Sequence, residues 1–141
     1  MGLFKSMTIS ASGMTAERLR LDLISSNLAN VSTTRTAEGG PYRRHTAVFA
    51  ERLERVLGRP GSFRGRGVAV AEIVRDDSPP RLVYDPSHPD ANEEGYVAYP
   101  NINVVNEMVD LITASRAYEA NVTALNAAKT MALKALEIGR A

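Results

Sequence analysis

The sequence contains no cysteine, which excludes disulfides, thiolate metal sites and cysteine nucleophiles. Net charge is also low, since 17 lysines and arginines stand against 16 aspartates and glutamates, a formal +1. The chain therefore lacks the basic excess of a protein that neutralises phosphates, and we expect no nucleic-acid partner. No stretch approaches the roughly 20 apolar residues of a membrane span, and residues 1–8 lack the apolar core of a secretory signal. Ordinary signal-peptide secretion is therefore not expected.

The composition that is present suits one domain with a modest core, because 44% of 141 residues are apolar. A large multi-domain enzyme is excluded. The charges are unevenly placed: residues 35–66 hold eight arginines against three glutamates (+5), whereas residues 72–95 hold seven acids against two arginines (−5). Two interpretations stay open. The two regions are solvated and neutralise each other in the fold, or they form complementary contacts between neighbouring subunits.

A helical stripe of apolar side chains covers residues 6–31, with spacings of three, four and seven residues. Its members are Met7, Met14, Leu21, Ile24, Leu28 and Val31. Gly13 interrupts the helix at a cost of about 1 kcal/mol relative to alanine, and several serines add little helix preference. Such a helix needs a partner that covers its apolar face, because propensity alone does not offset the ordering of its backbone.

A second, longer helix is predicted from Asn101 to Ile138, where neither glycine nor proline occurs. Apolar residues recur every seven positions with companions four residues later, the pattern of a coiled-coil-like seam. The recurring positions are Val104, Leu111, Tyr118, Leu125 and Ala132, and the companions are Met108, Val122 and Leu136. Asn101 or Asn103 can cap the first turn, and Glu107 complements the positive end of the helix dipole. At about 1.5 Å per residue this helix is roughly 55 Å long, so it must project or be covered by other chains.

The middle of the chain shows short, alternating, β-branched runs separated by turn signals. These runs are residues 47–49, 67–75, 82–84 and 96–99. We therefore expect a mainly α fold with a small β-rich insert, in which the two long terminal helices pack as an antiparallel coiled-coil-like pair. The predicted regions are an N-terminal helix at 1–35, the insert at 36–100 and a long C-terminal helix at 101–141.

Each end of the chain contains a motif of a known type. The run SNLANVSTT at 26–34, with Asn27, Leu28, Ala29, Asn30 and Val31, resembles the "NLANVxT" signature of the flagellar rod and hook protein family. The runs NEMVDLI at 106–112 and SRAYEAN at 115–121 resemble its C-terminal axial motif, with Arg116, Ala117, Tyr118 and Asn121. The middle of the chain is similar to one particular rod protein, at PYRR (41–44) and at residues 82–101. Other rod proteins lack a middle segment of this kind.

The resemblance implies a structural subunit, without enzymatic activity or cofactor, of the rod of the bacterial flagellum basal body in the periplasmic space. It implies export by the flagellar type III apparatus without a cleaved signal peptide. The implied partners are copies of itself, other rod subunits, and export-gate or membrane-ring adaptor proteins at the rod base, with no small-molecule substrate. The expected assembly interface is formed by Met7, Met14, Leu21, Ile24, Leu28, Val31, Val104, Met108, Leu111, Tyr118, Val122, Leu125 and Leu136.

Other chemistry has little support. Asp85, His88 and Asp90 are metal-ligand types, but their spacing fits no metal motif, and the flanking prolines indicate a rigid turn. The glycine- and arginine-rich residues 58–67 indicate a flexible surface loop, with contact to an acidic neighbouring subunit as the alternative. The competing hypothesis is a cytoplasmic coiled-coil adaptor that binds one partner helix. An enzyme that uses Asp85 or His88 is the third.

Overall fold

The structure, a computed structural model, describes residues 2–55 and 63–139 of the chain. Its elements are, in order, helix α1 (Gly2–Ala29), strands β1 (His45–Arg55), β2 (Phe63–Arg75), β3 (Arg81–Tyr84) and β4 (Tyr96–Tyr99), and helix α2 (Val104–Ile138). The predicted fold class is confirmed, because the two long terminal helices pack together and a small β-rich insert lies between them in the sequence. Of the predicted loop at 58–67, residues 58–62 lie outside the described residues, and the remainder belongs to β2.

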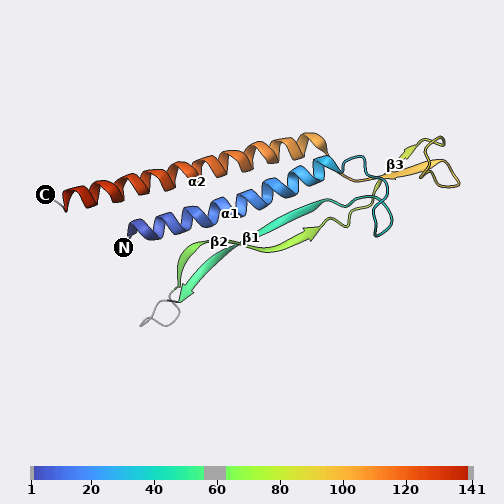
Figure 1. Cartoon of the computed structure of the whole chain (residues 1–141). Coiled ribbons are helices and arrows are strands. Elements are labelled where there is room, and N and C mark those ends of the chain that lie inside the picture. The colour runs from blue at the N-terminus through green and yellow to red at the C-terminus, as the bar shows by residue number, and fades with distance from the viewer. Residues whose placement is uncertain (1, 56–62, 140–141) are drawn as a thin grey trace.

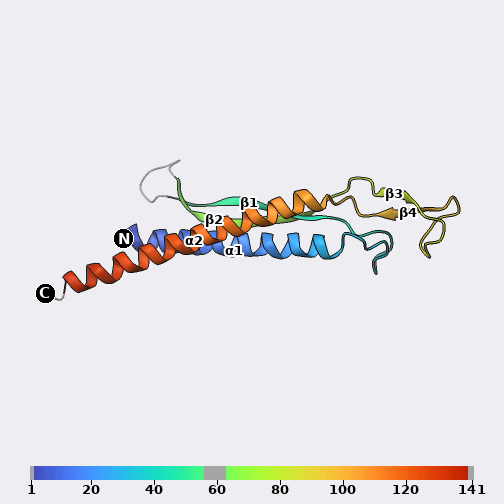
Figure 2. The same ribbon diagram turned by 90° about the horizontal axis from the view of Figure 1, so that it is seen from above.

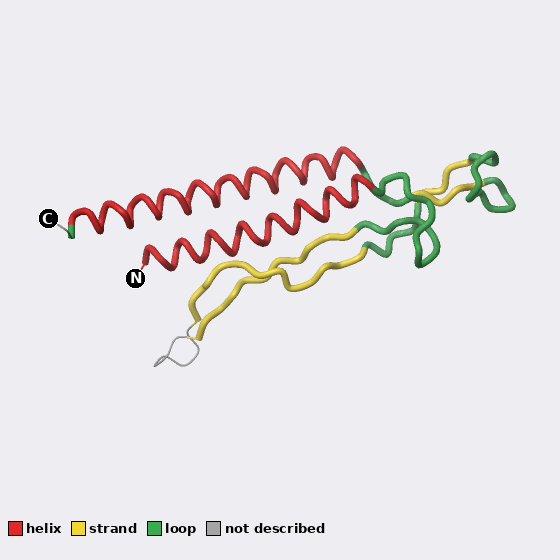
Figure 3. Tube along the Cα trace, in the orientation of Figure 1, coloured by secondary structure: helices red, strands yellow, loops and turns green. Residues whose placement is uncertain are grey.

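The molecule is elongated and layered, as Figure 1 shows. Helix α1 lies between α2 on one side and the hairpin of β1 and β2 on the other, and it contacts both. Seen from above, α2 crosses α1 at a shallow angle (Figure 2). The hairpin of β3 and β4 extends past the helices at the end opposite both termini (Figure 3). The middle position gives α1 the largest share of contacts between elements.

The two helices run antiparallel, because Asn27 near the end of α1 bonds to Glu107 near the start of α2. Farther along, Gly13 faces Asn121. The contact is lined with small side chains, and Ala16, Ala114 and Ala128 are among the buried residues. Small residues allow two helix axes to approach closely. Gly13, expected only to interrupt a helix, therefore gives α2 the space for this approach.

The start of α2 is capped as predicted. Asn103 is the N-cap, and its Oδ1 accepts hydrogen bonds from the backbone N–H of Val105 at 3.0 Å and of Asn106 at 3.3 Å. This satisfies two of the N–H groups that a helix start leaves unpaired. With 35 residues α2 is about 52 Å long, whereas α1 has 28 residues, and α2 extends beyond the start of α1 (Figure 1).

The β1–β2 hairpin is antiparallel and carries register shifts at Val48/Phe49 and Glu51/Leu53. It docks on α1 where the Val68 N–H donates to the Ser12 Oγ at 3.0 Å. Gly67 has a φ of +110°, and a Cβ there would lie 2.1 Å from that same oxygen, so only glycine fits. The strands predicted at 47–49 and 67–75 are confirmed but extend further, since pairing across the hairpin lengthens both.

The β3–β4 hairpin pairs Val83 with Val97, and the segment between the strands folds into turns. Asp85 accepts hydrogen bonds from the Ser87 N–H at 3.1 Å and from the Ser87 hydroxyl, which together lower the pKa of the Asp85 carboxyl. This confirms the predicted turn. Asp90 accepts a hydrogen bond from the Thr34 hydroxyl at 2.8 Å, so the segment is tied to the chain that follows α1.

The core is small, and much apolar surface is exposed. The buried apolar residues are Ala16, Ile24, Val97, Ile102, Ala114 and Ala128. The exposed large apolar residues of α2 are Val104, Val105, Met108, Val109, Ile112, Met131, Leu133, Leu136 and Ile138. Within the described residues, neither helix is apolar enough over its length to span a membrane. An exposed apolar row along one helix typically marks a protein–protein contact.

Candidate assembly interface

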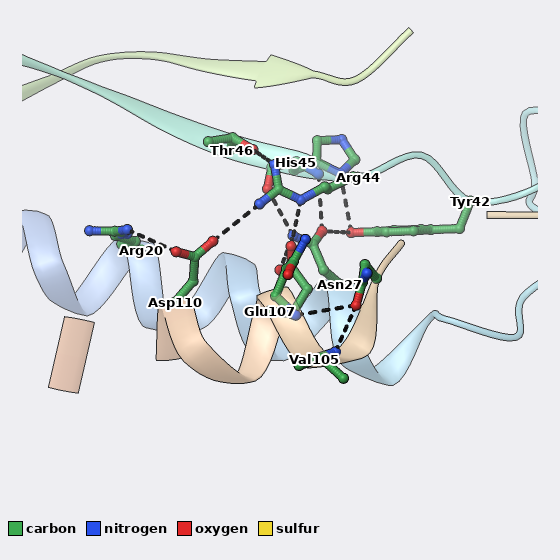
Figure 4. A network of polar contacts seen from close by, with 11 residues as sticks. Arg20, Asn27, Tyr42, Arg44, His45, Thr46, Val105, Glu107 and Asp110 are labelled. Atoms are coloured by element: carbon green, nitrogen blue, oxygen red, sulfur yellow. Dashed lines mark hydrogen bonds and ion pairs between the residues drawn. The ribbon is translucent and has the colours of Figure 1, made fainter. Parts of the chain in front are cut away.

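A buried asparagine of the N-terminal motif organises one end of the helix pair (Figure 4). The Asn27 Nδ2 donates to the His45 backbone carbonyl at 2.9 Å and to the Glu107 Oε2 at 3.1 Å. Its Oδ1 accepts from the His45 N–H at 3.0 Å and from the Tyr42 hydroxyl at 3.2 Å. Asn27 is fully buried, and both donors and both lone pairs of its amide are used. No aspartate or leucine could replace this set of bonds.

Glu107 continues this arrangement on α2. Its carboxylate is 1% exposed and accepts a hydrogen bond from the Arg44 Nε. The same guanidinium reaches the Asp110 Oδ2 at 3.5 Å, and Arg20 of α1 approaches the Asp110 Oδ1 at the same distance. We call these residues, namely Arg20, Asn27, Tyr42, Arg44, His45, Glu107 and Asp110, the polar cluster.

The polar cluster joins three separate segments: the end of α1, the start of β1 and the first turns of α2. A buried carboxylate is strongly unfavourable unless it is paired and hydrogen-bonded, and Glu107 meets both conditions. The cluster therefore specifies one arrangement of the helices and the hairpin, because any other arrangement would leave a buried charge unpaired. Polar contacts therefore hold this end of the helix pair together, beside the buried side chains of Ile24 and Ile102.

The residues predicted to form the assembly interface fall into three groups. Ile24 is buried between elements. Most of the others are half-buried, namely Met7, Met14, Leu21, Leu28, Val31, Leu111, Tyr118, Val122 and Leu125. Val104, Met108 and Leu136 are 42%, 53% and 66% exposed. These three lie outside the close contact of the two helices, which is made by Gly13 and alanines, and their contact with other subunits stays a prediction.

Several of these residues share one side of the helix pair. A shallow groove between the helices is lined by Leu21 of α1 and by Leu111, Ile112, Ser115, Arg116 and Glu119 of α2. Met14 and Leu28 lie seven residues from Leu21, and seven residues in a helix return to nearly the same face. By the same spacing Met108 and Val122 share the face of Ser115. We call this the groove side.

The remaining family-motif residues have varied roles. Asn30 donates to the Ser26 carbonyl at 2.9 Å and accepts from the Thr33 hydroxyl at 3.1 Å, which shapes the end of α1. Asn121 donates to the Ala117 carbonyl at 2.9 Å and packs against Gly13. Ala29 and Arg116 are exposed, and Tyr118 is half-buried. The motifs thus contain both packing and surface positions.

Sequence reasoning missed the polar cluster. The sequence predicts Glu107 only as a partner of the helix dipole, and Arg44 only as part of a basic region and of the PYRR run. The available signal was Asn27, a polar residue within the apolar stripe of the first helix. Its hydrogen-bond partners lie 15, 18 and 80 residues away, so no local pattern identifies them.

Comparison with known proteins agrees with this geometry at both ends of the chain. Residues 7–35 match the family described as "Flagella basal body rod protein". Residues 93–138 match the family described as "Flagellar basal body rod FlgEFG protein C-terminal". The matched segments contain α1 with Asn27 and α2 with Glu107. These two matches, which cover both terminal helices, indicate the class of flagellar basal-body rod proteins.

Proteins that match the chain over nearly its whole length identify the family more narrowly. The chain is 51% identical to the flagellar basal-body rod protein FlgC of Borreliella burgdorferi over 98% of both chains. It is 49% identical to the FlgC protein of Bacillus subtilis, over 99% of this chain and 100% of that one. Identity to the FlgC protein of Escherichia coli O6:H1 is 42% over similar shares. The chain belongs to the FlgC family of flagellar basal-body rod proteins.

This membership makes the chain a structural, non-enzymatic subunit of the flagellar basal-body rod, which assembles with other rod subunits. The predicted resemblance and location in the rod are confirmed. The alternatives of a cytoplasmic adaptor and of an enzyme were wrong, because relatives over nearly the full length are rod proteins.

Proposed function

We propose that this subunit of the proximal rod assembles through the groove side of its helix pair, and that the resulting tube is a drive shaft that transmits torque across the periplasm. The observation that carries the proposal is the convergence of Met14, Leu21 and Leu28 of α1 with Leu111 and Ile112 of α2 on one side. Apolar side chains gathered on one side of a monomer favour contact with another protein. A contact between unlike patches of equivalent subunits does not close, so it generates an open helical array.

The internal contacts of the subunit suit a protein that transmits torque. The polar cluster fixes α1, β1 and α2 relative to one another, and the β1–β2 hairpin braces α1 along its other side. Interiors packed in this way have low compressibility and transmit strain. A torque applied at one end of the helix pair is therefore carried by both layers that enclose α1.

The small core also suits passage through an export channel. Few apolar side chains are buried within one subunit, and exposed apolar residues remain on α2. We propose that the chain leaves the cell unfolded through the flagellar type III apparatus and completes its folding on the growing rod. At the rod base its partners would be export-gate or membrane-ring adaptor proteins, and elsewhere copies of itself and other rod subunits.

The assembly proposal is tested by placing a charge on the groove side. Met14→Asp is expected to abolish swimming and to remove the subunit from isolated basal bodies, because the carboxylate would be buried between subunits. Thr113→Asp is the matched control, since Thr113 is exposed on α2 and lies about 200° around the helix from Ser115. Swimming-halo diameter and immunoblots of basal bodies measure both. A motile Met14→Asp strain with normal rod content would contradict the proposed interface.

Export is tested separately. The wild-type subunit should be found outside the cytoplasm in cells with the flagellar export apparatus and stay inside cells that lack it. Equal distribution in both strains would contradict export by this route.

A further inference from the structure

The β3–β4 hairpin stands apart from the other elements of the fold. Within the described residues β3 and β4 contact each other but no other helix or strand, and the hairpin extends past the helices (Figure 3). A loop contact, in which Asp90 accepts a hydrogen bond from Thr34, ties it to the chain after α1. An isolated two-stranded hairpin is at best marginally stable in water. We call residues 81–99 the arm, and a contact from outside the chain would stabilise it.

The two faces of the arm differ in exposure. The strand register pairs Val83 with Val97 on one face, where Val97 is fully buried. It pairs Tyr84 with Tyr96 on the other face, where Leu82 also lies because alternate residues of a strand point to the same side. Leu82, Tyr84 and Tyr96 are 62%, 65% and 40% exposed. We call these three residues the outer face.

The outer face is held in a fixed shape. The rings of Tyr84 and Tyr96 meet edge to face, with their centroids 5.3 Å apart. Gly95 has a φ of +81°, and a Cβ there would lie 2.9 Å from the Tyr84 ring, so the turn accommodates this ring because residue 95 has no side chain. A side chain that is already ordered loses little conformational freedom on binding, and tyrosine is enriched among residues that dominate protein interfaces. The outer face is therefore suited to docking on another protein.

Negative charge borders the outer face. Asp85 follows Tyr84 directly, and the exposed Glu93 and Glu94 lie in the turn before β4. No ion pair within the described ranges neutralises these three acids. Hydrogen bonds from the Ser87 hydroxyl and N–H lower the pKa of the Asp85 carboxyl, which is therefore ionised at neutral pH.

The remaining charged groups of the arm lie away from the outer face. Arg81 is on the opposite face, where its guanidinium lies 5.9 Å from the centroid of the Tyr99 ring. Asp90 faces Arg35 at 4.0 Å. The His88 Nδ1 accepts a hydrogen bond from the Asp90 N–H, so that nitrogen carries no proton. The arm thus has four acids against one arginine, a net −3.

The arginines at the base of the arm are already paired with acids of the same chain. These pairs are Arg35 with Asp90, Arg43 with Asp77 and Arg75 with Glu38. The basic and acidic regions of the sequence are therefore partly neutralised within the fold, and the charge beside the outer face is left over. The end of β1 that carries Arg52 lies toward the opposite end of the molecule, near the termini (Figure 1). A second copy side by side with the first therefore could not bring Arg52 to the arm.

From these observations we propose that the outer face docks on a basic surface of a neighbouring rod subunit of another kind. Leu82 and Tyr84 enter an apolar site on that subunit, and its lysines or arginines pair with the acids beside the outer face. Opposite charges across an interface speed association and suppress wrong partners. This inference rests on the proposed assembly function, and it adds a contact surface that is separate from the groove side.

Photocrosslinking in isolated basal bodies identifies the occupant directly. Cells express the full chain with Tyr84→p-benzoylphenylalanine, and irradiation should link it to a rod protein of another kind, which mass spectrometry identifies together with the linked peptide. We expect lysine or arginine in or beside that peptide. Thr113→p-benzoylphenylalanine is the control, because Thr113 is exposed on α2 and far from the arm, and it should not give this product.

Three results of the crosslinking would overturn the inference. They are a product between two copies of this chain, a linked peptide without a basic residue nearby, and no product from basal bodies that hold normal amounts of the variant. None of them bears on the groove side. The proposed function fails on a different result, namely a motile Met14→Asp strain with normal rod content.

Charge reversal provides an independent measurement if the crosslinking variant does not enter the rod. Glu94→Lys should reduce swimming-halo diameter severalfold without unfolding the arm, because the Glu94 carboxylate forms no hydrogen bond or ion pair within the described part of the chain. Glu72→Lys is the matched control, since Glu72 is equally exposed and lies on β2, and it should swim normally. Normal swimming of the Glu94→Lys strain, or equal impairment of both strains, would refute the contact.

Discussion

Gly13 of α1 lies so close to Asn121 of α2 that a Cβ on Gly13 would come within 2.9 Å of the Asn121 amide nitrogen. The amide is held in place, since its Nδ2 donates to the Ala117 carbonyl. Both residues lie in the segments by which the chain matches flagellar rod families. The absence of a side chain on Gly13 therefore allows the terminal helices to approach closely at this position.

The first prediction concerns this contact. Gly13→Ala raises helix propensity by about 1 kcal/mol, but overpacking against Asn121 costs about 1–3 kcal/mol, so we expect a net loss of rod incorporation. Adding Asn121→Ala should restore it, because the clashing amide is gone. Immunoblots of isolated basal bodies measure the effect. If Gly13→Ala alone incorporates better than wild type, close approach is not the reason for glycine here.

The second prediction concerns two adjacent arginines. Arg44→Ala leaves the buried Glu107 carboxylate without its cation and should destabilise the fold by about 3–5 kcal/mol, enough to abolish swimming. Arg43→Ala removes only the exposed pair with Asp77 and should cost at most about 1 kcal/mol. Halo diameters compare the two. Glu107→Gln should partly rescue Arg44→Ala, and equal phenotypes for the two arginines would contradict the role of the polar cluster.

The third prediction concerns the amide of Asn27. Asn27→Asp exchanges two donors for a carboxylate beside Glu107, so we expect it to be more harmful than Asn27→Ala, which leaves only unpaired groups. The nearby Asn30→Ala should be mild, since Asn30 makes local contacts only. Subunit level and swimming of the three strains give the order. An Asn27→Asp strain that swims better than Asn27→Ala would contradict the assigned hydrogen bonds.

The fourth prediction concerns the free subunit. The helices hold 28 and 35 of 141 residues, which is about 45% of the chain. With so few buried apolar residues, the dilute subunit should show helix content by circular dichroism well below that value. Helix content should rise as the protein concentration is raised. A fully helical monomer at low concentration would contradict folding that depends on assembly.

Local features of the fold could be predicted from the sequence, whereas long-range partners could not. The cap at Asn103 and the four strands follow from residue types over a few positions. The antiparallel arrangement of the helix pair follows from their apolar stripes and their order in the chain. The bulges of β1 and the docking of Gly67 on Ser12 depend on how elements meet, which no local pattern contains.

The candidate site divides in the same way. Leu21 and Leu111 could be assigned to a contact surface because their spacing is helical. The exposure of Val104 and Met108 could not be predicted, because the seven-residue repeat alone does not say which face a neighbouring helix covers. Here the alanines of α2, rather than its largest apolar residues, face α1.

The middle position of α1 has a consequence for the order in which the chain acquires its structure. Helix α1 comes first in the chain, but one of its partners lies far along the sequence, since Asn27 bonds to Glu107 across 80 residues. Contacts so distant in sequence form slowly, because a long segment must close before they contribute. We therefore expect the helix pair to form slowly, which would suit the proposed export of the unfolded chain.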